Sequence, residues 1–368
     1  RITISDEAPT TIRSDDFNTC SLQDFWVFEN PLDAGGTYAI EGAGTGEGLL
    51  RFDLPDGTAH EFWGATGNEA VRIMQPAPNS DFQIEIAFDS EPTGGFDGHG
   101  IIVRQDDDNW LRFDVFHSGS TLVAFTGRTI GGANLTGPSK SIATGEGLKL
   151  RITRQGNDWT MEHRNAEGDW AVVGMVSQPL AVTEAGWMAA NTSGDPYSVS
   201  ADYFFNTASP IVPEDGMLNT VNVTIEGEGS VDLSPVATAD VYACGTEVTL
   251  TAIPDAGYRF DEWGGDVEGT VSTTSLTIDG PAAVTATFVL ENVDTTPPVI
   301  TLSGANPLTL QVGETYQDPP YIATDETDGD LTGEVTASGE VDTTTPGTYT
   351  RVFSATDSSG NTGTTTLQ

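Results

Sequence analysis

The sequence predicts an all-β protein made of several domains. Its 368 residues are enough for two to four domains, and 42 glycines and 20 prolines supply many turns. Between these turns, short runs alternate apolar and polar residues, as half-buried strands do. No long stretch places apolar residues at helical spacing. The composition therefore favours sandwiches of short strands over helical bundles.

The chain is strongly acidic, with 14 Lys and Arg against 55 Asp and Glu and a net charge of −41. Such a charge disfavours nucleic acid and anionic membranes as partners and favours divalent cations. Hydration of a secreted protein in saline surroundings explains the same charge, so both interpretations stay open. We find no apolar run long enough for a membrane-spanning helix and no signal peptide before Arg1. We expect a mature product or a fragment of a longer secreted protein.

The first predicted module covers residues 12–206. Roughly ten strand candidates, broken by Gly and Asp turns, indicate a two-sheet sandwich of jelly-roll type. The candidates are TYAIEG, LLRFDL, FQIEIAFDS, GIIVRQ, WLRFDVFH, TLVAFTG, LKLRITRQ, WTMEHRN, WAVVGMV and SADYFFN.

Three segments of this module carry a family resemblance. They are the Asp15-Asp16-Phe17 start, GHGIIVRQDDDNWLRFDV at 98–115, and the closing strands GWMAAN and SADYFFN within 186–206. Together they resemble the concanavalin-like lectin/glucanase superfamily. The resemblance implies the fold and leaves the activity open, because the superfamily holds lectins, glycosidases, lyases and scaffolds.

Residues 207–218, TASPIVPEDGML, combine prolines, acids and glycine without periodicity and are predicted to form a semi-stiff linker. The second module is predicted over 219–291. Its Ala252, Pro254, Gly257-Tyr258-Arg259-Phe260 run and Trp263 resemble the divergent internalin-type B repeat. The resemblance implies a compact β-rich fold, in which Phe260 and Trp263 are most simply core anchors.

The third module is predicted over 295–368. Its Thr-Thr-Pro-Pro-Val start, its Asp-Gly-Asp-Leu-Thr turn and its Pro-Gly-Thr-Tyr-Thr element resemble the bacterial immunoglobulin-like domain of secreted and surface proteins. The resemblance implies a spacer or adhesion role and a secreted or cell-surface location. Pro297 and Pro298 stiffen the junction before it.

Two cysteines, Cys20 and Cys244, are too few for a disulfide-dense scaffold and too far apart for a zinc cluster. In an oxidising compartment they could pair and clamp the first module to the second. Two free thiols remain the alternative.

Glycan binding requires solvent-facing aromatic rings together with side chains that hydrogen-bond to hydroxyl groups. Trp63 sits in a polar, Gly-flanked stretch, and Trp110 follows an Asp run beside Arg104 and Arg112. We expect these four residues to contact an extracellular or cell-wall polysaccharide. The alternative is that both tryptophans belong to the core of the sandwich.

Carboxylates at two places are candidates for structural Ca²⁺, which prefers oxygen ligands. Asp16 and Asp202 lie in the first and last strands of the jelly roll, whose ends are neighbours in this fold. In the third module the candidates are turn residues: Asp325, Asp328, Asp330 and Asp357. Strand-edge acids and turn stabilisation without metal explain the same residues. The run at 105–109 is interpreted as a hairpin turn rather than a third cation site.

A glycoside hydrolase would need two suitably spaced carboxylates. Glu85 and Asp89 lie on one predicted strand, but Ala87 occupies the place of the middle acid in the Glu-x-Asp-x-Glu pattern of glycosidases in this superfamily. We therefore predict no catalytic residues.

The sequence predicts a non-catalytic, secreted or cell-surface bacterial segment, in which the jelly roll recognises a polysaccharide and the other two modules are spacers. Its partners would be the polysaccharide and, in one possibility, other copies of the chain. The alternatives are a hydrolase or lyase on the jelly roll and a structural subunit of a fibre or matrix.

Overall fold

The computed structural model describes residues 11–62, 69–144, 147–291 and 294–368. Apart from one short 3-10 helix, η1 (Thr332–Glu334), the regular elements of these residues are strands. The predicted all-β fold class is confirmed. In the described part of the chain, no helix is long and apolar enough to cross a membrane.

The chain forms two compact units. The first runs to Glu226 and also contains 231–253 and 262–287, whereas the second holds 227–230, 254–261 and 288–368. The division passes through the predicted second module. The boundaries that we placed from the sequence remain predictions.

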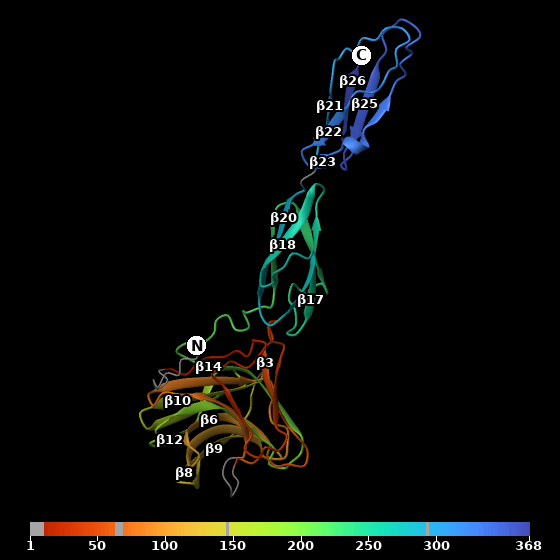
Figure 1. Cartoon of the computed structure of the whole chain (residues 1–368). Helices are drawn as coiled ribbons and strands as arrows, with labels where there is room; N and C mark the ends of the chain where they lie inside the picture. The colour runs from red at the N-terminus through yellow and green to blue at the C-terminus, as the bar shows by residue number, and fades with distance from the viewer. Residues whose placement is uncertain (1–10, 63–68, 145–146, 292–293) are drawn as a thin grey trace. The chain divides into compact units, whose positions relative to one another are not determined.

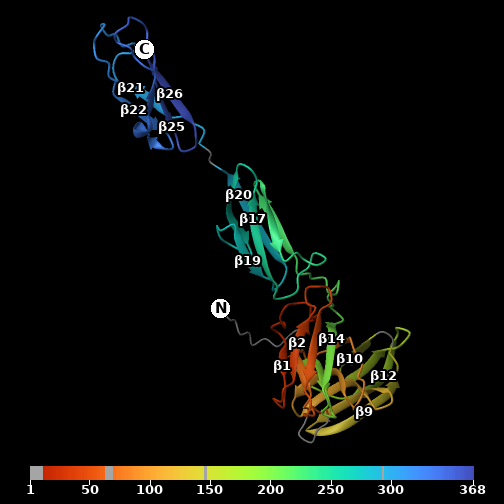
Figure 2. The same ribbon diagram turned by 90° about the vertical axis from the view of Figure 1, so that its right-hand side faces the viewer.

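Residues 27–206 contain fourteen strands in two seven-stranded antiparallel sheets (Figure 1). The first sheet has the order β1 (Val27–Glu29), β4 (Val71–Pro76), β13 (Glu184–Ala190), β6 (Gly98–Asp106), β7 (Asn109–His117), β8 (Leu122–Ile130), β9 (Ala133–Ile142). The second has the order β12 (Trp170–Ser177), β11 (Asp158–Arg164), β10 (Leu148–Gln155), β5 (Phe82–Phe88), β14 (Tyr197–Asn206), β3 (Leu49–Leu54), β2 (Thr37–Glu41). Figure 2 labels β2, β14, β10 and β12 across this second sheet.

The core of the jelly roll lies between the two sheets. Alternate residues of each strand point inward, as Ile84, Ile86 and Phe88 of β5 do. Phe52 of β3 stacks on Trp187 of β13 with ring centroids 3.9 Å apart, so the two rings join the sheets. Large apolar side chains thus hold the two layers together.

The prediction of roughly ten strands was too low. Strand β1 is only three residues long, and β4 is buried at five consecutive positions, so neither shows clear alternation. Strand β9 is mostly exposed and contains Gly137 and Pro138, which are unusual within a strand. Pro138 lies against Gly174 of β12 and helps close one side of the sandwich.

The residues of the predicted second module form two three-stranded sheets. One has the order β15 (Val221–Glu226), β20 (Ala282–Leu290), β18 (Tyr258–Gly265), and the other has the order β16 (Gly229–Ser234), β17 (Glu247–Pro254), β19 (Thr273–Thr277). Strands β15 and β20 are parallel. Trp263 is buried, as expected of a core anchor, and Phe260 is half-buried with its ring 5.9 Å from that of Phe288.

A disulfide joins Cys20 to Cys244, which decides between the two alternatives left open by the sequence. Asn219 lies beside it: its N–H donates to the carbonyl of Gly44 (2.8 Å), and its carbonyl accepts from the N–H of Tyr242 (3.0 Å). The clamp between the jelly roll and the following segment is therefore both covalent and hydrogen-bonded.

The third module also has two three-stranded sheets: β21 (Val299–Leu302), β22 (Tyr321–Asp325), β23 (Gly329–Asp330), and β24 (Thr336–Ser338), β25 (Arg351–Thr356), β26 (Thr362–Leu367). Its buried core contains five residues: Ile300, Ala323, Phe353, Ala355 and Leu367. Because the core is so small, turns and polar contacts have a larger share in holding this module together.

Candidate functional site

Strand β7 carries two of the four predicted glycan-binding residues, Trp110 and Arg112, on one face of the first sheet. Leu111, Phe113 and Val115 point into the core, so Trp110, Arg112 and Asp114 alternate with them on the outer face, away from the second sheet. Trp63 lies outside the described residues.

Trp110 is only 2% exposed. It packs in a second apolar cluster on the outer face, with Phe62, Met74, Ile102 and Met188. Trp110 therefore does not present the solvent-facing ring that the stacking hypothesis requires. The core alternative describes it correctly, although this cluster is separate from the main core.

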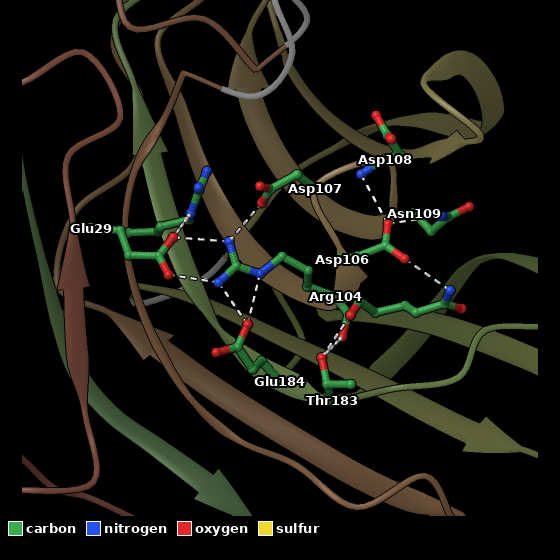
Figure 3. A network of polar contacts seen from close by, with 10 residues as sticks. Glu29, Arg104, Asp106, Asp107, Asp108, Asn109, Thr183 and Glu184 are labelled. Atoms are coloured by element: carbon green, nitrogen blue, oxygen red, sulfur yellow. Dashed lines mark hydrogen bonds and ion pairs between the residues drawn. The ribbon is translucent and has the colours of Figure 1, made fainter.

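Arg104 binds two carboxylates of the protein itself (Figure 3). Its guanidinium lies 2.6 Å from an oxygen of Glu29 on β1 and 2.6 Å from one of Glu184 on β13. Partial burial alone would raise the pKa of Glu29, but the hydrogen bond from Arg104 and the charge of Arg72 hold that pKa below its usual value. Arg104 is thus already engaged in joining three strands, which leaves it a structural role rather than the predicted ligand contact.

The turn that follows Arg104 is the predicted hairpin. Strand β6 ends at Asp106 and β7 begins at Asn109. The carboxylate of Asp106 accepts from the Asp108 N–H (3.0 Å) and the Asn109 side chain (2.7 Å), as Figure 3 shows. These bonds are those of a turn-stabilising Asp.

Arg112 and Asp114 form a buried ion pair on the outer face, with Nε 3.3 Å from Oδ1. Asp114 is 0% exposed, and burial raises its pKa to about 6 despite the nearby positive charge. The guanidinium of Arg112 lies between two rings, 4.6 Å from the centroid of Phe62 and 5.1 Å from that of Phe125. Arg112 is therefore held between aromatic rings, and it is not freely exposed as the prediction assumed.

A row of three phenylalanines continues the outer face towards solvent. We call Phe96, Phe116 and Phe125 the phenylalanine row. Phe96 and Phe116 stack with centroids 5.9 Å apart, and Phe116 meets Phe125 edge-on at 6.3 Å. Since Phe125 also contacts Arg112, the row connects the buried ion pair to the surface.

Phe96 has an unusual conformation. The residue is 54% exposed, and its backbone has φ of 62°, in the left-handed region that bulky residues avoid. Its N–H donates to the carbonyl of His117 (3.2 Å). Phe96 was not among the predicted residues, although glycines flank it in the Gly94-Gly95-Phe96-Asp97-Gly98 run as they flank Trp63.

Asp97 follows Phe96 and is buried, and its Oδ1 has no hydrogen-bond partner in the described structure. Burial, and secondarily the charge of Asp195, raise the pKa of Asp97 to about 6.

The ends of the jelly roll meet as the calcium prediction requires. Asp15 and Phe204 exchange two backbone hydrogen bonds (2.9 and 2.8 Å), next to Asp16 and Asp202. Asp16 accepts from the N–H of Asp215 (3.2 Å) in the predicted linker. Burial and the charge of Asp202 raise the pKa of Glu214 to about 7. The linker therefore adds acids that the prediction lacked, and calcium at Asp16 and Asp202 stays a prediction.

In the third module, three carboxylates come together: one oxygen each from Asp294, Asp328 and Asp357 lies within 4.8 Å of the others. Asp328 and Asp357 were predicted, whereas Asp294 was not. Asp330 is exposed, accepts from the Thr332 N–H (2.9 Å) and lies outside this group.

The carboxylate that would serve a hydrolase is already engaged. Glu85 lies on the outer face of the second sheet, where its oxygens accept from Arg151 (2.8 Å) and from the Tyr203 hydroxyl (2.7 Å). Arg151 stacks over Trp170 at 3.7 Å. Asp89 lies just beyond the end of β5 and is exposed. This arrangement supports no catalytic assignment.

Comparison with known proteins finds a family for each module. Residues 57–208 match the model of a family of proteins of unknown function, DUF1349. Residues 219–292 match the divergent InlB B-repeat domain, and residues 300–367 match the Ig-like domain of bacterial surface proteins. The multimodular resemblance seen in the sequence is confirmed. No curated protein matches the chain.

Several solved structures are similar to part of the chain. A mutant of the GH43 protein BlXynB from Bacillus licheniformis has 16% identity and a TM-score of 0.42, covering 55% of this chain and 40% of that one. The Bacteroides ovatus xyloglucan PUL GH43B has 19% identity and the same TM-score and coverages. The CBM2 module of the evolved Dit of Lactobacillus casei BL23 phage J-1 has 13% identity and a TM-score of 0.37, covering 52% and 93%. The chain thus spans 40% of the length of the two GH43 proteins.

Proposed function

We propose that this chain is a non-catalytic, extracellular glycan-binding segment. The jelly roll recognises a polysaccharide through the outer face of its first sheet, and the two following modules act as spacers. The observation that carries the proposal is Phe96, an exposed aromatic ring held in a strained backbone conformation.

The strain argues for a function of Phe96. A bulky residue in the left-handed region costs about 1–3 kcal/mol and persists where the surrounding structure holds it. Glycine stands on the chain at 94, 95 and 98 and would adopt this conformation without cost. An exposed ring kept at such a position is best explained by contact with a ligand.

The neighbours of Phe96 suit a sugar. A ring stacks on the apolar CH face of a pyranose, while charged and polar groups bind its hydroxyls. The phenylalanine row supplies the rings: Phe96 is exposed, and Phe116 and Phe125 are half-buried. Arg112 is buried and packs against Phe125 at the inner end of the row. A single ring gives weak binding, which several copies on one surface would strengthen through avidity.

The location is proposed from the two later modules. Their family models are described as a bacterial surface protein Ig-like domain and an InlB B-repeat domain. A surface or secreted protein would use such modules to hold the jelly roll away from its point of attachment.

The fibre-subunit alternative has less support. The edge strand β9 contains Gly137, Pro138 and Lys140, which hinder pairing with the edge of another molecule.

A glycan array with the full chain tests the proposal. Phe96→Ala should weaken binding about tenfold, the loss expected when one stacked ring is removed. Tyr38→Ala is the matched control, because Tyr38 is another exposed ring of the jelly roll, on β2. The proposal fails if the unaltered chain binds no glycan, or if the two variants bind equally.

A further inference from the structure

We propose that the third module binds a divalent cation of the calcium type between Asp294, Asp328 and Asp357. Their nearest carboxylate oxygens lie within 4.8 Å of one another. Two oxygens on opposite sides of one Ca²⁺ are about 4.6–5.2 Å apart, since each Ca–O distance is about 2.3–2.6 Å. The three oxygens can therefore share a single ion. This inference is independent of glycan recognition by the jelly roll.

Hydrogen bonds hold two of the three carboxylates in place. Asp328, in the turn between β22 and β23, accepts from the N–H (3.0 Å) and the hydroxyl (2.7 Å) of Ser358. Asp357, which follows β25, is 7% exposed and accepts from the N–H (2.7 Å) and side chain (2.9 Å) of Asn361. Both turns are thus fixed with their acids facing each other.

Asp294 belongs to the segment before β21 and is joined to the same turns. Its Oδ1 accepts from the N–H (3.0 Å) and hydroxyl (2.6 Å) of Thr296, and its carbonyl accepts from the Asn361 side chain (3.0 Å). Its Oδ2 is buried and has no hydrogen-bond partner in the described part of the chain. One oxygen thus holds the turn, and the other remains available for an ion.

A fourth acid provides separate evidence for a ligand. Asp325 is only 9% exposed, and its Oδ1 accepts from the N–H groups of Thr327 (2.8 Å) and Asp328 (3.0 Å). These bonds place its carboxylate at the base of the turn that carries Asp328. Its Oδ2 is buried without a partner among the described residues. Buried carboxylate oxygens rarely remain unsatisfied, because desolvation without compensation is costly.

The chemistry of the site selects the ion. The group contains only carboxylates, with no His or Cys, which favours a hard cation such as Ca²⁺ over zinc or copper. No ion pair within the described residues joins these four acids to Lys or Arg. Their negative charges therefore repel one another unless a cation lies between them.

An ion here would connect three segments of the module: the approach to β21, the β22–β23 turn and the turn after β25. The buried core of the module has only five residues, so such a link would make a large relative contribution to its stability.

Calcium titration calorimetry of the full chain in a high-salt buffer tests the proposal, because salt suppresses diffuse binding to a chain of charge −41. Asp294→Asn keeps the oxygen that accepts from Thr296 and removes the charge. Asp342→Asn is the matched control: Asp342 makes the same two bonds, to Thr344 (2.9 and 2.6 Å), but lies outside the group. We expect Asp294→Asn to weaken calcium binding at least about tenfold and Asp342→Asn to leave it unchanged.

Further measurements keep the outcome decisive. If Asp294→Asn only disturbed folding, its melting temperature in the presence of a chelator would be lower than that of Asp342→Asn. Equal melting temperatures in chelator would show that Asp294→Asn removes a calcium ligand and leaves the fold intact. Asp202→Asn tests whether the calcium binds to the acids of the jelly roll instead. The proposal is overturned if no saturable calcium binding occurs, if the Asp294 and Asp342 variants bind alike, or if only Asp202→Asn abolishes binding.

Discussion

Burial raises the pKa of several carboxyls in the jelly roll, whereas hydrogen bonds lower the pKa of several carboxyls in the immunoglobulin-like module. In the jelly roll and its linker, burial raises the pKa of Asp97 and Asp114 to about 6 and that of Glu214 to about 7. In the third module, hydrogen bonds from Arg351 lower the pKa of Asp318, and those from Thr344 lower the pKa of Asp342. One acidic chain thus contains carboxyls that favour the neutral form and others that favour the charged form.

The size of the core accounts for this difference. The jelly roll has a continuous core between two seven-stranded sheets, whereas the third module buries five apolar residues. A large core can compensate for the cost of burying charged groups, and a small one cannot. Net charge alone therefore does not tell how an acidic chain uses its acids.

Loss of the Cys20–Cys244 disulfide should cause the largest fall in the free energy of unfolding, and only in the first compact unit. The bond closes a loop with a sequence separation of 224, for which chain entropy predicts about 5 kcal/mol of stabilisation. Urea unfolding with and without reductant, followed by tryptophan fluorescence, measures this, since residues 295–368 contain no tryptophan. Hydrogen exchange in peptides from the third module should stay unchanged, and an equal loss there would contradict the comparison.

Breaking the buried ion pair of the jelly roll should cost more than breaking an ion pair of the third module. Arg112→Met leaves Asp114 buried beside no cation and should lower the free energy of unfolding by about 3 kcal/mol. Arg351→Met removes a partly exposed pair with Asp318 and should cost at most about 1 kcal/mol. Denaturant unfolding of both variants measures the difference. Equal costs would show that burial does not separate the two regions.

The two regions should respond to pH in opposite directions. Asp97, Asp114 and Glu214 keep their protons to a higher pH in the folded state than in the unfolded state. The free energy of unfolding therefore falls as pH rises from about 4 to about 7. Acidification from about pH 8 to about pH 5 should therefore stabilise the jelly roll. The lowered pKa of Asp318 stabilises the third module above its unfolded value of 3.8, and this contribution disappears as pH falls below that value. Melting curves followed by tryptophan fluorescence measure the stability of the jelly roll at each pH, and hydrogen exchange measures that of the third module. The same pH dependence in both regions would contradict this prediction.

The sequence was sufficient for the fold class because local patterns determine it. Strand β5 alternates inward Ile84, Ile86 and Phe88 with outward residues, and glycine turns separate such runs. The three family resemblances rest on equally local motifs. Strand β9 was missed because its exposed residues show no alternation, and pairing with β8 determines its structure.

The candidate sites were harder to predict because they depend on contacts distant in sequence. Alternation places Trp110 and Arg112 together on one face of β7, but only the folded chain shows that Phe62 and Met188 lie over that face. The Asp328-Gly329-Asp330 triplet indicated Asp330 as a ligand, but Asp330 lies outside the group in the structure. Asp294 joins Asp328 and Asp357 instead, across 34 residues or more of sequence, and no local motif marks it.

The disulfide between Cys20 and Cys244 also determines how the polypeptide transmits tension. If the chain is pulled at a point before Cys20 and a point after Cys244, the load passes through the two sulfur atoms and bypasses everything between them. The sheets that carry Phe96 then experience no stretching along their backbone. Roughly 700–800 Å of contour length stays unavailable for extension, at about 3.3–3.6 Å per residue. The jelly roll would therefore stay folded when tension is applied along the chain from outside this loop, as long as the sulfurs stay oxidised.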